Sequence, residues 1–242
     1  MVSMKKLLFL LLAFAGLNAA AQQTKIIQDA NARQRTIAGA FTQISVATGI
    51  QLYVTQGNET SLAVSVSNEK YNKSFKTEVV NGVLKIYMDI KEIGWLKDKN
   101  RLLKAYLSIK TLEKLTASSG AEVFTADTLN VNGFIMKFSG GAQFNGVIKA
   151  TDLQIDQSSG SEINISGAAA NLKIRVSSGA SFSGYYLITQ NCTAKASSGA
   201  DANITVSNTL DAHASSGGTI QYKGNGSVKT LRANSGGSVR KV

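Results

Sequence analysis

Apolar and polar residues alternate in short stretches through the second half of this chain, and the alternation restarts after each copy of a four-residue turn. The turn reads Ser-Ser-Gly followed by a small residue, or a close variant of it. We call the third residue of each turn its anchor; the anchors are Gly120, Gly141, Gly160, Gly179, Gly199, Gly217 and Gly236. They are 21, 19, 19, 20, 18 and 19 residues apart, and such a steady period is typical of stacked repeats.

Three columns of the repeat are apolar in almost every copy. The column three residues after the anchor contains Val123, Phe144, Ile163, Phe182, Ala202, Ile220 and Val239. The columns five and three residues before the anchor are also apolar, with Gln157 as the exception, and the column between them is polar or charged. Because the side chains of a strand alternate between its faces, this pattern predicts half-buried strands before and after each turn. A helix is excluded, since the apolar positions recur every two residues.

The repeat predicts an all-β protein, a parallel β-helix in which about seven rungs stack roughly 4.8 Å apart around one core. A propeller is disfavoured because each blade needs about 40–50 residues. We expect the anchor glycine to adopt a positive φ angle, which penalises other side chains. We also expect the serines of successive turns to form ladders of hydroxyl hydrogen bonds, because each hydroxyl can donate and accept.

The first half of the chain predicts a leader and further strands. Residues 1–21 have the features of a signal peptide, with two lysines, an apolar run and an Ala-Ala-Ala cleavage site, and residues 22–35 form a polar leader. We expect one domain over 36–242, with N-terminal strands over 36–115 that cap or continue the solenoid and repeats over 116–242. Asn81-Gly82 predicts a hairpin turn, and the segment from Lys91 to Lys104 predicts a long loop or helical excursion.

Composition and charge are consistent with an exported protein. Loss of the signal peptide removes two lysines and no acid, which lowers the formal net charge from +11 to +9. After that removal no apolar run approaches the length of about 20 residues that spans a membrane. Cys192 is the single cysteine, so no disulfide can form within the chain, and we expect a buried thiol. The predicted location is the periplasm, the outer surface or the medium.

The candidate binding residues form a basic column four residues before the anchor, which Asp156 interrupts. We call the basic residues of this column, with Lys173 two positions earlier on the same face, the basic stripe; its members are Lys137, Lys173, Arg175, Lys195, His213 and Arg232. Regular spacing near 4.8 Å suits a linear anionic polymer, such as an anionic polysaccharide or another cell-surface component. The alternative is a solvated face that keeps copies of the protein apart. Nucleic acid is disfavoured because the stripe has no interleaved aromatic residues.

An enzymatic function is the alternative from another class, because β-helices also form polysaccharide lyases and hydrolases. Glu122 and Glu162 would lie two rungs apart, about 9.6 Å by stacking, near the upper limit for an inverting glycosidase. Gln143 stands between them, and this column is expected to face solvent. One histidine and one cysteine cannot supply the four ligands of a zinc site. The sequence therefore predicts a non-enzymatic protein with no cofactor.

The N-terminal strands and the turns together resemble a known bacterial family. The relevant segments are Gly39-Ala40-Phe41, the run from Thr48 to Val54, the hairpin from Asn81 to Ile86, and the serial Ser-Ser-Gly-Ala turns. These are similar to the family called putative auto-transporter adhesin, head GIN domain, over the region from Gly39 to Tyr222. The resemblance implies a right-handed β-helix and an exported location. It provides no catalytic or ligand-binding residues, and we interpret Gly49-Ile50, which match the glycine-isoleucine motif, as structural.

Overall fold

The computed structural model describes residues 29–89 and 101–242, and within them the chain is almost entirely β-structure. The signal peptide and most of the segment from Lys91 to Lys104 lie outside these residues, although Leu103 and Lys104 begin a strand. One short 3-10 helix, η1 (Glu69–Tyr71), accompanies sixteen strands in one sheet. The strands are β1 (Arg33–Arg35), β2 (Gln43–Val46), β3 (Gln51–Gln56), β4 (Ser61–Val66), β5 (Phe75–Val80), β6 (Val83–Met88), β7 (Leu103–Ile109), β8 (Lys114–Ala117), β9 (Glu122–Phe138), β10 (Gln143–Gln157), β11 (Glu162–Val176), β12 (Ser181–Ala196), β13 (Asp201–Ala214), β14 (Thr219–Lys223), β15 (Ser227–Ala233) and β16 (Ser238–Lys241).

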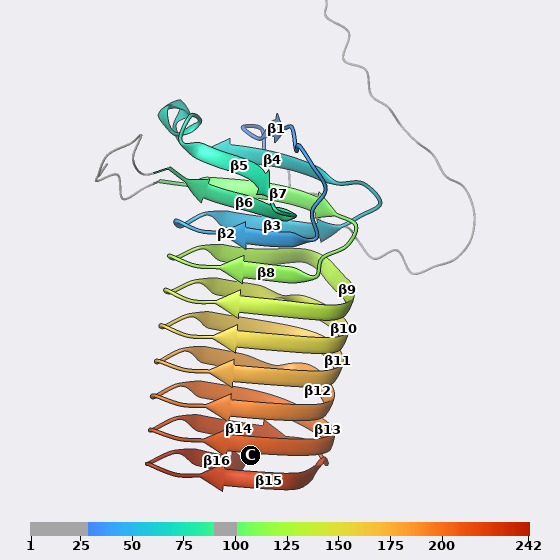
Figure 1. The fold of residues 1–242 in the computed structure, drawn as a ribbon, viewed down its shortest axis with the longest axis vertical. Coiled ribbons are helices and arrows are strands. Elements are labelled where there is room, and N and C mark those ends of the chain that lie inside the picture. Colours follow the sequence, from blue (N-terminus) through green and yellow to red (C-terminus); the bar gives the residue numbers. More distant parts are fainter. Residues whose placement is uncertain (1–28, 90–100) are drawn as a thin grey trace, which may run out of the picture.

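The repeats form the predicted parallel solenoid, and each rung from β9 to β13 is one long strand rather than two. These strands contain 14 to 17 residues and pair in parallel with the strands above and below them. Each strand leaves a turn on one face of the solenoid, bends, and returns on the other face to the next turn (Figure 1). We call these two parts the outgoing half and the return half.

The predicted core columns are confirmed. Phe144 lies in register with Val123 and Ile163, and all three side chains are buried. The polar exception, Gln157, is buried as well, and its Nε2 donates to the backbone oxygens of Ser161 at 2.9 Å and Ser181 at 2.7 Å. These two bonds satisfy the amide nitrogen in an apolar column, whereas the buried Gln157 Oε1 has no hydrogen-bond partner among the described residues.

Both central residues of the repeat turn adopt positive φ angles. In the turn before β12, Ser178 has φ 53° and Gly179 has φ 67°, and the N–H of Ala180 donates to the oxygen of Ser177 at 3.2 Å. Two positive φ angles in a two-residue connection define a type I′ turn, the turn that suits the twist of adjoining strands. The prediction for the anchor glycine is confirmed, and the second serine shares its left-handed conformation.

Backbone amides, rather than hydroxyls, connect successive turns. The N–H of Gly179 donates to the oxygen of Ser198 in the next turn at 3.1 Å, and the same bond recurs along the column of anchors. The predicted hydroxyl ladder is wrong. Among the turn serines of the described chain, the hydroxyl–hydroxyl bond joins Ser159 to Ser158 of the same turn, at 3.5 Å. Equivalent hydroxyls of successive rungs are spaced about 4.8 Å apart, which is longer than the donor–acceptor distance of roughly 2.7–2.8 Å in an O–H···O hydrogen bond.

Gly179→Val should lower the free energy of unfolding by at least about 1–2 kcal/mol, because a β-branched residue is disfavoured at positive φ. Gly133→Val is a matched control: Gly133 is exposed on β9, and an added Cβ would meet no heavy atom within 4 Å at either glycine. Only the turn variant should unfold at lower urea concentration. Equal stability of the two variants would show that the turn conformation carries no such penalty.

Two turns with a pair of positive φ angles lie outside the predicted repeats in the described chain: the Asn81-Gly82 hairpin turn, at 52° and 73°, and the turn between β2 and β3. Thr48 and Gly49 have φ angles of 63° and 70°, and the N–H of Gly49 donates to the oxygen of Ser119 at 3.0 Å. The strands on either side continue the stack, since β2 pairs in parallel with β8 and β3 pairs in parallel with β9. The glycine-isoleucine motif therefore forms a further rung of the solenoid, as the structural interpretation of Gly49-Ile50 requires, although its turn lacks the serines.

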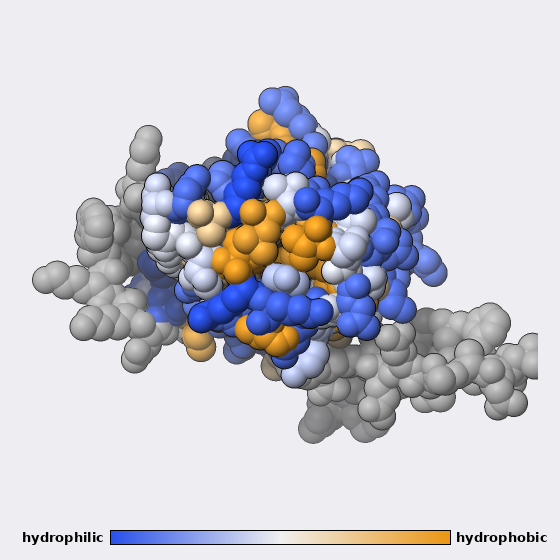
Figure 2. Space-filling model, turned by 90° about the horizontal axis from the view of Figure 1, so that it is seen from below, coloured by the Kyte–Doolittle hydropathy of each residue, from blue (hydrophilic) through white to orange (hydrophobic). Residues whose placement is uncertain are grey.

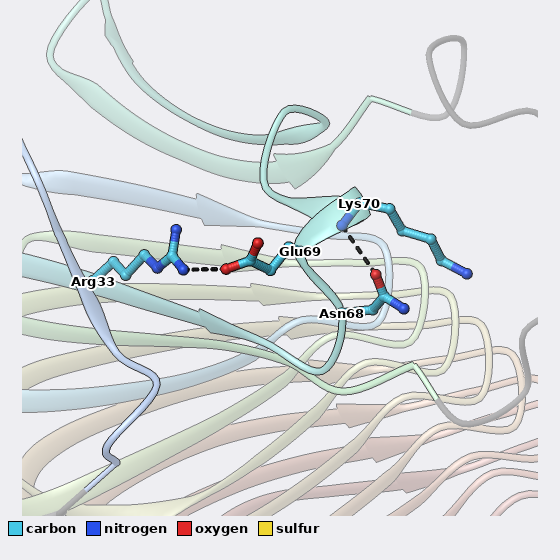
Figure 3. A network of polar contacts seen from close by, with 4 residues as sticks. All are labelled: Arg33, Asn68, Glu69 and Lys70. Carbon is cyan, nitrogen blue, oxygen red and sulfur yellow. Dashed lines mark hydrogen bonds and ion pairs between the residues drawn. The ribbon is translucent and has the colours of Figure 1, made fainter.

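Antiparallel strands close the N-terminal end. The predicted hairpin at Asn81-Gly82 joins β5 to β6, and on the other face β4 lies antiparallel to β7 with β1 outside it. Thus the end of the predicted polar leader contributes a strand. Figure 3 shows an ion pair at this edge between Arg33 and Glu69 of η1. Asn68 caps the start of η1, because the N–H of Lys70 donates to Asn68 Oδ1 at 3.0 Å.

Candidate functional site

The residues of the basic column lie on the outer face of the return halves. Lys137, Arg175, Lys195 and Arg232 are exposed, and His213 is half-buried. Strand register places the column in the order Lys137, Asp156, Arg175, Lys195, His213 and Arg232, with one residue from each rung. The column therefore runs parallel to the solenoid axis, and Asp156 interrupts the basic stripe between Lys137 and Arg175.

Asp156 neutralises part of the basic stripe. Its Oδ1 lies 3.2 Å from Arg175 Nη1, and its Oδ2 accepts a hydrogen bond from Gln154 Nε2 at 3.0 Å. The Arg175 side chain remains 50% exposed, so the ion pair contributes little to stability and leaves the guanidinium accessible. Within the described residues, Arg175 is the one member of the stripe that forms an ion pair.

An open groove of about 1030 Å³ runs beside the stripe. We call it the outer groove. Its floor includes the residues six and eight positions before the anchors from Gly141 to Gly217, which point outward from the return halves of β9 to β13, and Lys173 is one of them. On each strand the stripe residue lies two positions, about 7 Å, from the nearer groove residue and four positions, about 13 Å, from the farther one, so both can contact one extended ligand.

A ladder of amide hydrogen bonds forms one side of the outer groove. Asn171 Nδ2 donates to Asp152 Oδ1 at 2.8 Å, and Asn191 Nδ2 donates to Asn171 Oδ1 at 3.0 Å. Asn208 Nδ2 and Thr209 Oγ1 both donate to Asn191 Oδ1, at 3.0 and 2.7 Å. An asparagine amide has two donor hydrogens, so Asn171 and Asn191 each retain a donor for a ligand. The signal was present in the sequence, because Asp152, Asn171, Asn191 and Thr209 all stand eight residues before an anchor.

A second groove, of about 830 Å³, lies beside a stack of three aromatic rings that the sequence analysis missed. The Tyr53 ring stacks on those of Tyr106 and Phe124, with centroid distances of 5.2 and 5.1 Å. The Tyr106 hydroxyl donates to Asp29 Oδ2 at 2.7 Å. Burial and this bond raise the pKa of Tyr106, and the same bond lowers the pKa of Asp29. The phenol therefore stays protonated and anchors the leader against the sheet.

The candidate acids do not converge. Glu122 and Glu162 lie in one outward column with Gln143 between them. Glu122 accepts a hydrogen bond from Gln51 at 3.1 Å, and Glu162 accepts one from Asn164 at 2.9 Å. The two carboxylates thus have separate partners on separate rungs.

Cys192 is buried in the core column, as predicted. Burial raises the pKa of its thiol to about 12, with a smaller contribution from the charge of Asp211. The sulfur therefore remains a protonated, apolar packing group at neutral pH. In the described residues no three His, Cys, Asp or Glu side chains group closely enough to hold a metal ion, and no helix has the length and apolar character needed to cross a membrane.

The fold and its outer face define a class: a parallel β-solenoid with a polar groove along its axis. The chain belongs to the family described as putative auto-transporter adhesin, head GIN domain, which it matches over residues 40–226. This confirms the resemblance inferred from the turns and the Gly49-Ile50 motif. The family description suggests an extracytoplasmic location and indicates no catalytic activity. None of the curated proteins matches the chain.

Several crystal structures of bacterial proteins have similar folds. A putative adhesin from Bacteroides fragilis is 16% identical, with a TM-score of 0.75, covering 87% of this chain and 96% of that chain. A putative adhesin from Parabacteroides merdae is 18% identical, with a TM-score of 0.66, over 87% and 95% of the two chains. A putative lipid binding protein from Parabacteroides distasonis is 19% identical, with a TM-score of 0.63, over 87% and 96%. At these identities the comparisons show the fold alone.

Proposed function

We propose that this protein is an exported, non-enzymatic binding protein that holds an acidic polysaccharide along the outer groove and the basic stripe. The observation that supports this most directly is the juxtaposition of the two features. Cations in register stand about 13 Å along the strands from the amide donors Asn171 and Asn191, and both rows follow the solenoid axis. A linear polymer with regularly spaced carboxylates and hydroxyls offers matching partners for both rows.

The charge of the chain supports the same ligand class. The formal net charge is +11 for the full sequence, and a positive surface attracts polyanions over distances set by salt. The family description as an adhesin is compatible with this binding, and the site of action would be the periplasm, the outer surface or the medium. We do not extend the proposal to catalysis, because Glu122 and Glu162 each have a separate amide partner.

Changing Arg175 and Lys195 together to glutamate should abolish binding to polygalacturonate while leaving the urea unfolding curve unchanged, because both side chains are exposed. Binding of the parent should weaken between low and physiological salt, where the screening length falls to about 8–10 Å. Titration with labelled polygalacturonate, and with neutral dextran as the ligand control, measures both effects.

The matched control for this experiment is Arg240→Glu with Lys241→Glu, which makes the same charge change on β16. Since β16 belongs to an outgoing half, this variant should bind polygalacturonate like the parent. If both double variants lose binding equally, only net charge matters and the stripe is not a site. If the parent binds no acidic polysaccharide, the cations serve to keep copies of the protein apart.

A further inference from the structure

The C-terminal end of the solenoid exposes side chains of the kind that every earlier rung buries. Val228 is 39% exposed and Leu231 is 48% exposed, whereas Leu210 and Ala212, their partners in the rung above, are at most 1% exposed. Ala233 is exposed and Val239 is half-buried in the same layer. Figure 2 looks onto this end and shows an apolar centre surrounded by hydrophilic residues. We call the four residues Val228, Leu231, Ala233 and Val239 the end patch.

The same end presents strand edges without partners. Among the described residues, β15 pairs with β13 alone and β16 pairs with β14 alone, so one edge of each strand faces outward along the axis. The column of turn hydrogen bonds also stops here: Gly217 donates to Ser235, while the N–H of Gly236 has no backbone acceptor in the described chain. Open edges of this kind are templates for pairing with another extended chain.

The rim of the end patch is strongly basic. Asp211 is the last acidic residue of the sequence, and five cations follow it. Four of them, Lys229, Arg232, Arg240 and Lys241, lie on β15 and β16 and are exposed. None of these four forms an ion pair within the described residues. Strand alternation directs Arg232 and Arg240 outward beside the apolar patch.

We propose that the end patch is a docking site for an extended, acidic polypeptide segment of a partner protein, which adds to β15 or β16 as a further strand. Such a segment satisfies all three features at once. Its backbone pairs with the open edge, its inward apolar side chains cover Leu231 or Val239, and its outward carboxylates meet Arg232 or Arg240. This surface is separate from the outer groove and shares only Arg232 with the basic stripe, and the proposal does not depend on polysaccharide binding.

Two other ligands, a lipid surface and a second copy of the protein, match only some of the three features of the end patch. A lipid surface could cover the end patch and attract the cations, but hydrocarbon would leave the backbone groups of β15 and β16 without hydrogen bonds. A second copy docked end to end could pair the edges, but it would place cations opposite cations, which is destabilising across strands. Charge complementarity therefore favours an acidic strand.

The test uses the intact protein and a fluorescein-labelled, end-blocked nonapeptide in which glutamate alternates with valine. Fluorescence anisotropy should show saturable binding of this peptide, and a peptide with lysine in place of glutamate should not bind. Methylation of the peptide nitrogens on alternate residues, which blocks one hydrogen-bonding edge, should weaken binding at least about tenfold, because strand pairing needs those donors.

Protein variants locate the site. Arg240→Glu with Lys241→Glu should weaken peptide binding at least about tenfold, and Leu231→Asp should do the same, while Arg175→Glu with Lys195→Glu should bind the peptide like the parent. All of these side chains are exposed, and an unchanged urea unfolding curve verifies that each variant is folded.

Other outcomes overturn the proposal. Absence of peptide binding, or equal binding of the methylated peptide, would exclude strand addition. Binding to phosphatidylglycerol vesicles that the Arg240 and Lys241 variant loses, without peptide binding, would assign the end to a lipid surface. Concentration-dependent dimerisation in sedimentation experiments, removed by Leu231→Asp, would assign it to a second copy. Because the stripe variant is the control, failure here leaves polysaccharide binding unaffected.

Discussion

Phe182→Ala should lower the free energy of unfolding by roughly 3–5 kcal/mol, the range for loss of a fully buried ring. The Phe182 side chain is 0% exposed and lies in register between Ile163 and Ala202. The space that it leaves has small neighbours, because Ala202 lies below it and Gly184 lies beside it. Surrounding atoms therefore cannot fill the cavity without moving the backbone, which places the expected cost in the upper part of the range.

Urea unfolding of the parent and variant measures this cost. Tyr186→Ala is the matched control, because Tyr186 is an aromatic residue of the same strand whose side chain is 82% exposed. The control should change stability by no more than about 0.5 kcal/mol. A Phe182→Ala variant as stable as the control would show that this core column does not determine stability.

The core and the turns could be predicted because they repeat in the sequence. Every rung must bury the same positions, so columns such as Phe144, Ile163 and Phe182 stand out when the chain is aligned on its anchors. The positive φ of the anchor follows from the residue type, since glycine alone adopts it without a side-chain penalty. Both features follow from constraints within a single repeat, and each repeat shows the same residue types at the same positions.

Features that join distant segments could not be predicted in the same way. The stacked rings of Tyr53, Tyr106 and Phe124 come from three strands with different spacing in the sequence, and none belongs to an apolar core column. The rung formed around Thr48 and Gly49 was missed because its turn has no serine. Within the described residues, the serines before the anchor make no hydroxyl bond to a neighbouring rung, so the type I′ conformation does not require them; the Ser161 hydroxyl, after the anchor Gly160, does donate to the Phe138 oxygen of the neighbouring rung at 3.2 Å.

The candidate site was only half predicted for a related reason. The basic stripe is visible as a column of charges, but the outer groove depends on the shape of the return halves and on side-chain bonds between rungs. Asn171 and Asn191 become a ladder only because stacking brings residues twenty positions apart to about 4.8 Å. Outward positions are not constrained by the core, so their residue types indicate a ligand class rather than one ligand.

The core contains a second regularity that links neighbouring positions. Where the column three residues after the anchor holds Phe144 or Phe182, the residue two positions later is glycine, and an added Cβ there would lie 2.9 or 2.4 Å from the ring. Where that column holds Ala202, the residue two positions later is Ile204, which is buried. In these three rungs a large side chain at one position thus occupies the space of the other, whereas β11 buries two side chains of intermediate size, Ile163 and Ile165.

Gly184→Ile should therefore destabilise the parent by at least about 1–3 kcal/mol, the range for overpacking of a core, because its Cβ would meet the Phe182 ring. In Phe182→Ala the same substitution should be stabilising, since the isoleucine fills the vacated space and reproduces the Ala202 and Ile204 arrangement of the next rung. The favourable coupling between the two changes should reach about 1–3 kcal/mol in a double-mutant cycle measured by urea unfolding. The neighbouring Asn203 oxygen, 3.0 Å from the added Cβ, has to shift slightly, so recovery should be incomplete. If the double variant is as unstable as the sum of the two single variants, the two positions do not share one space, and the packing rule for the rungs is wrong.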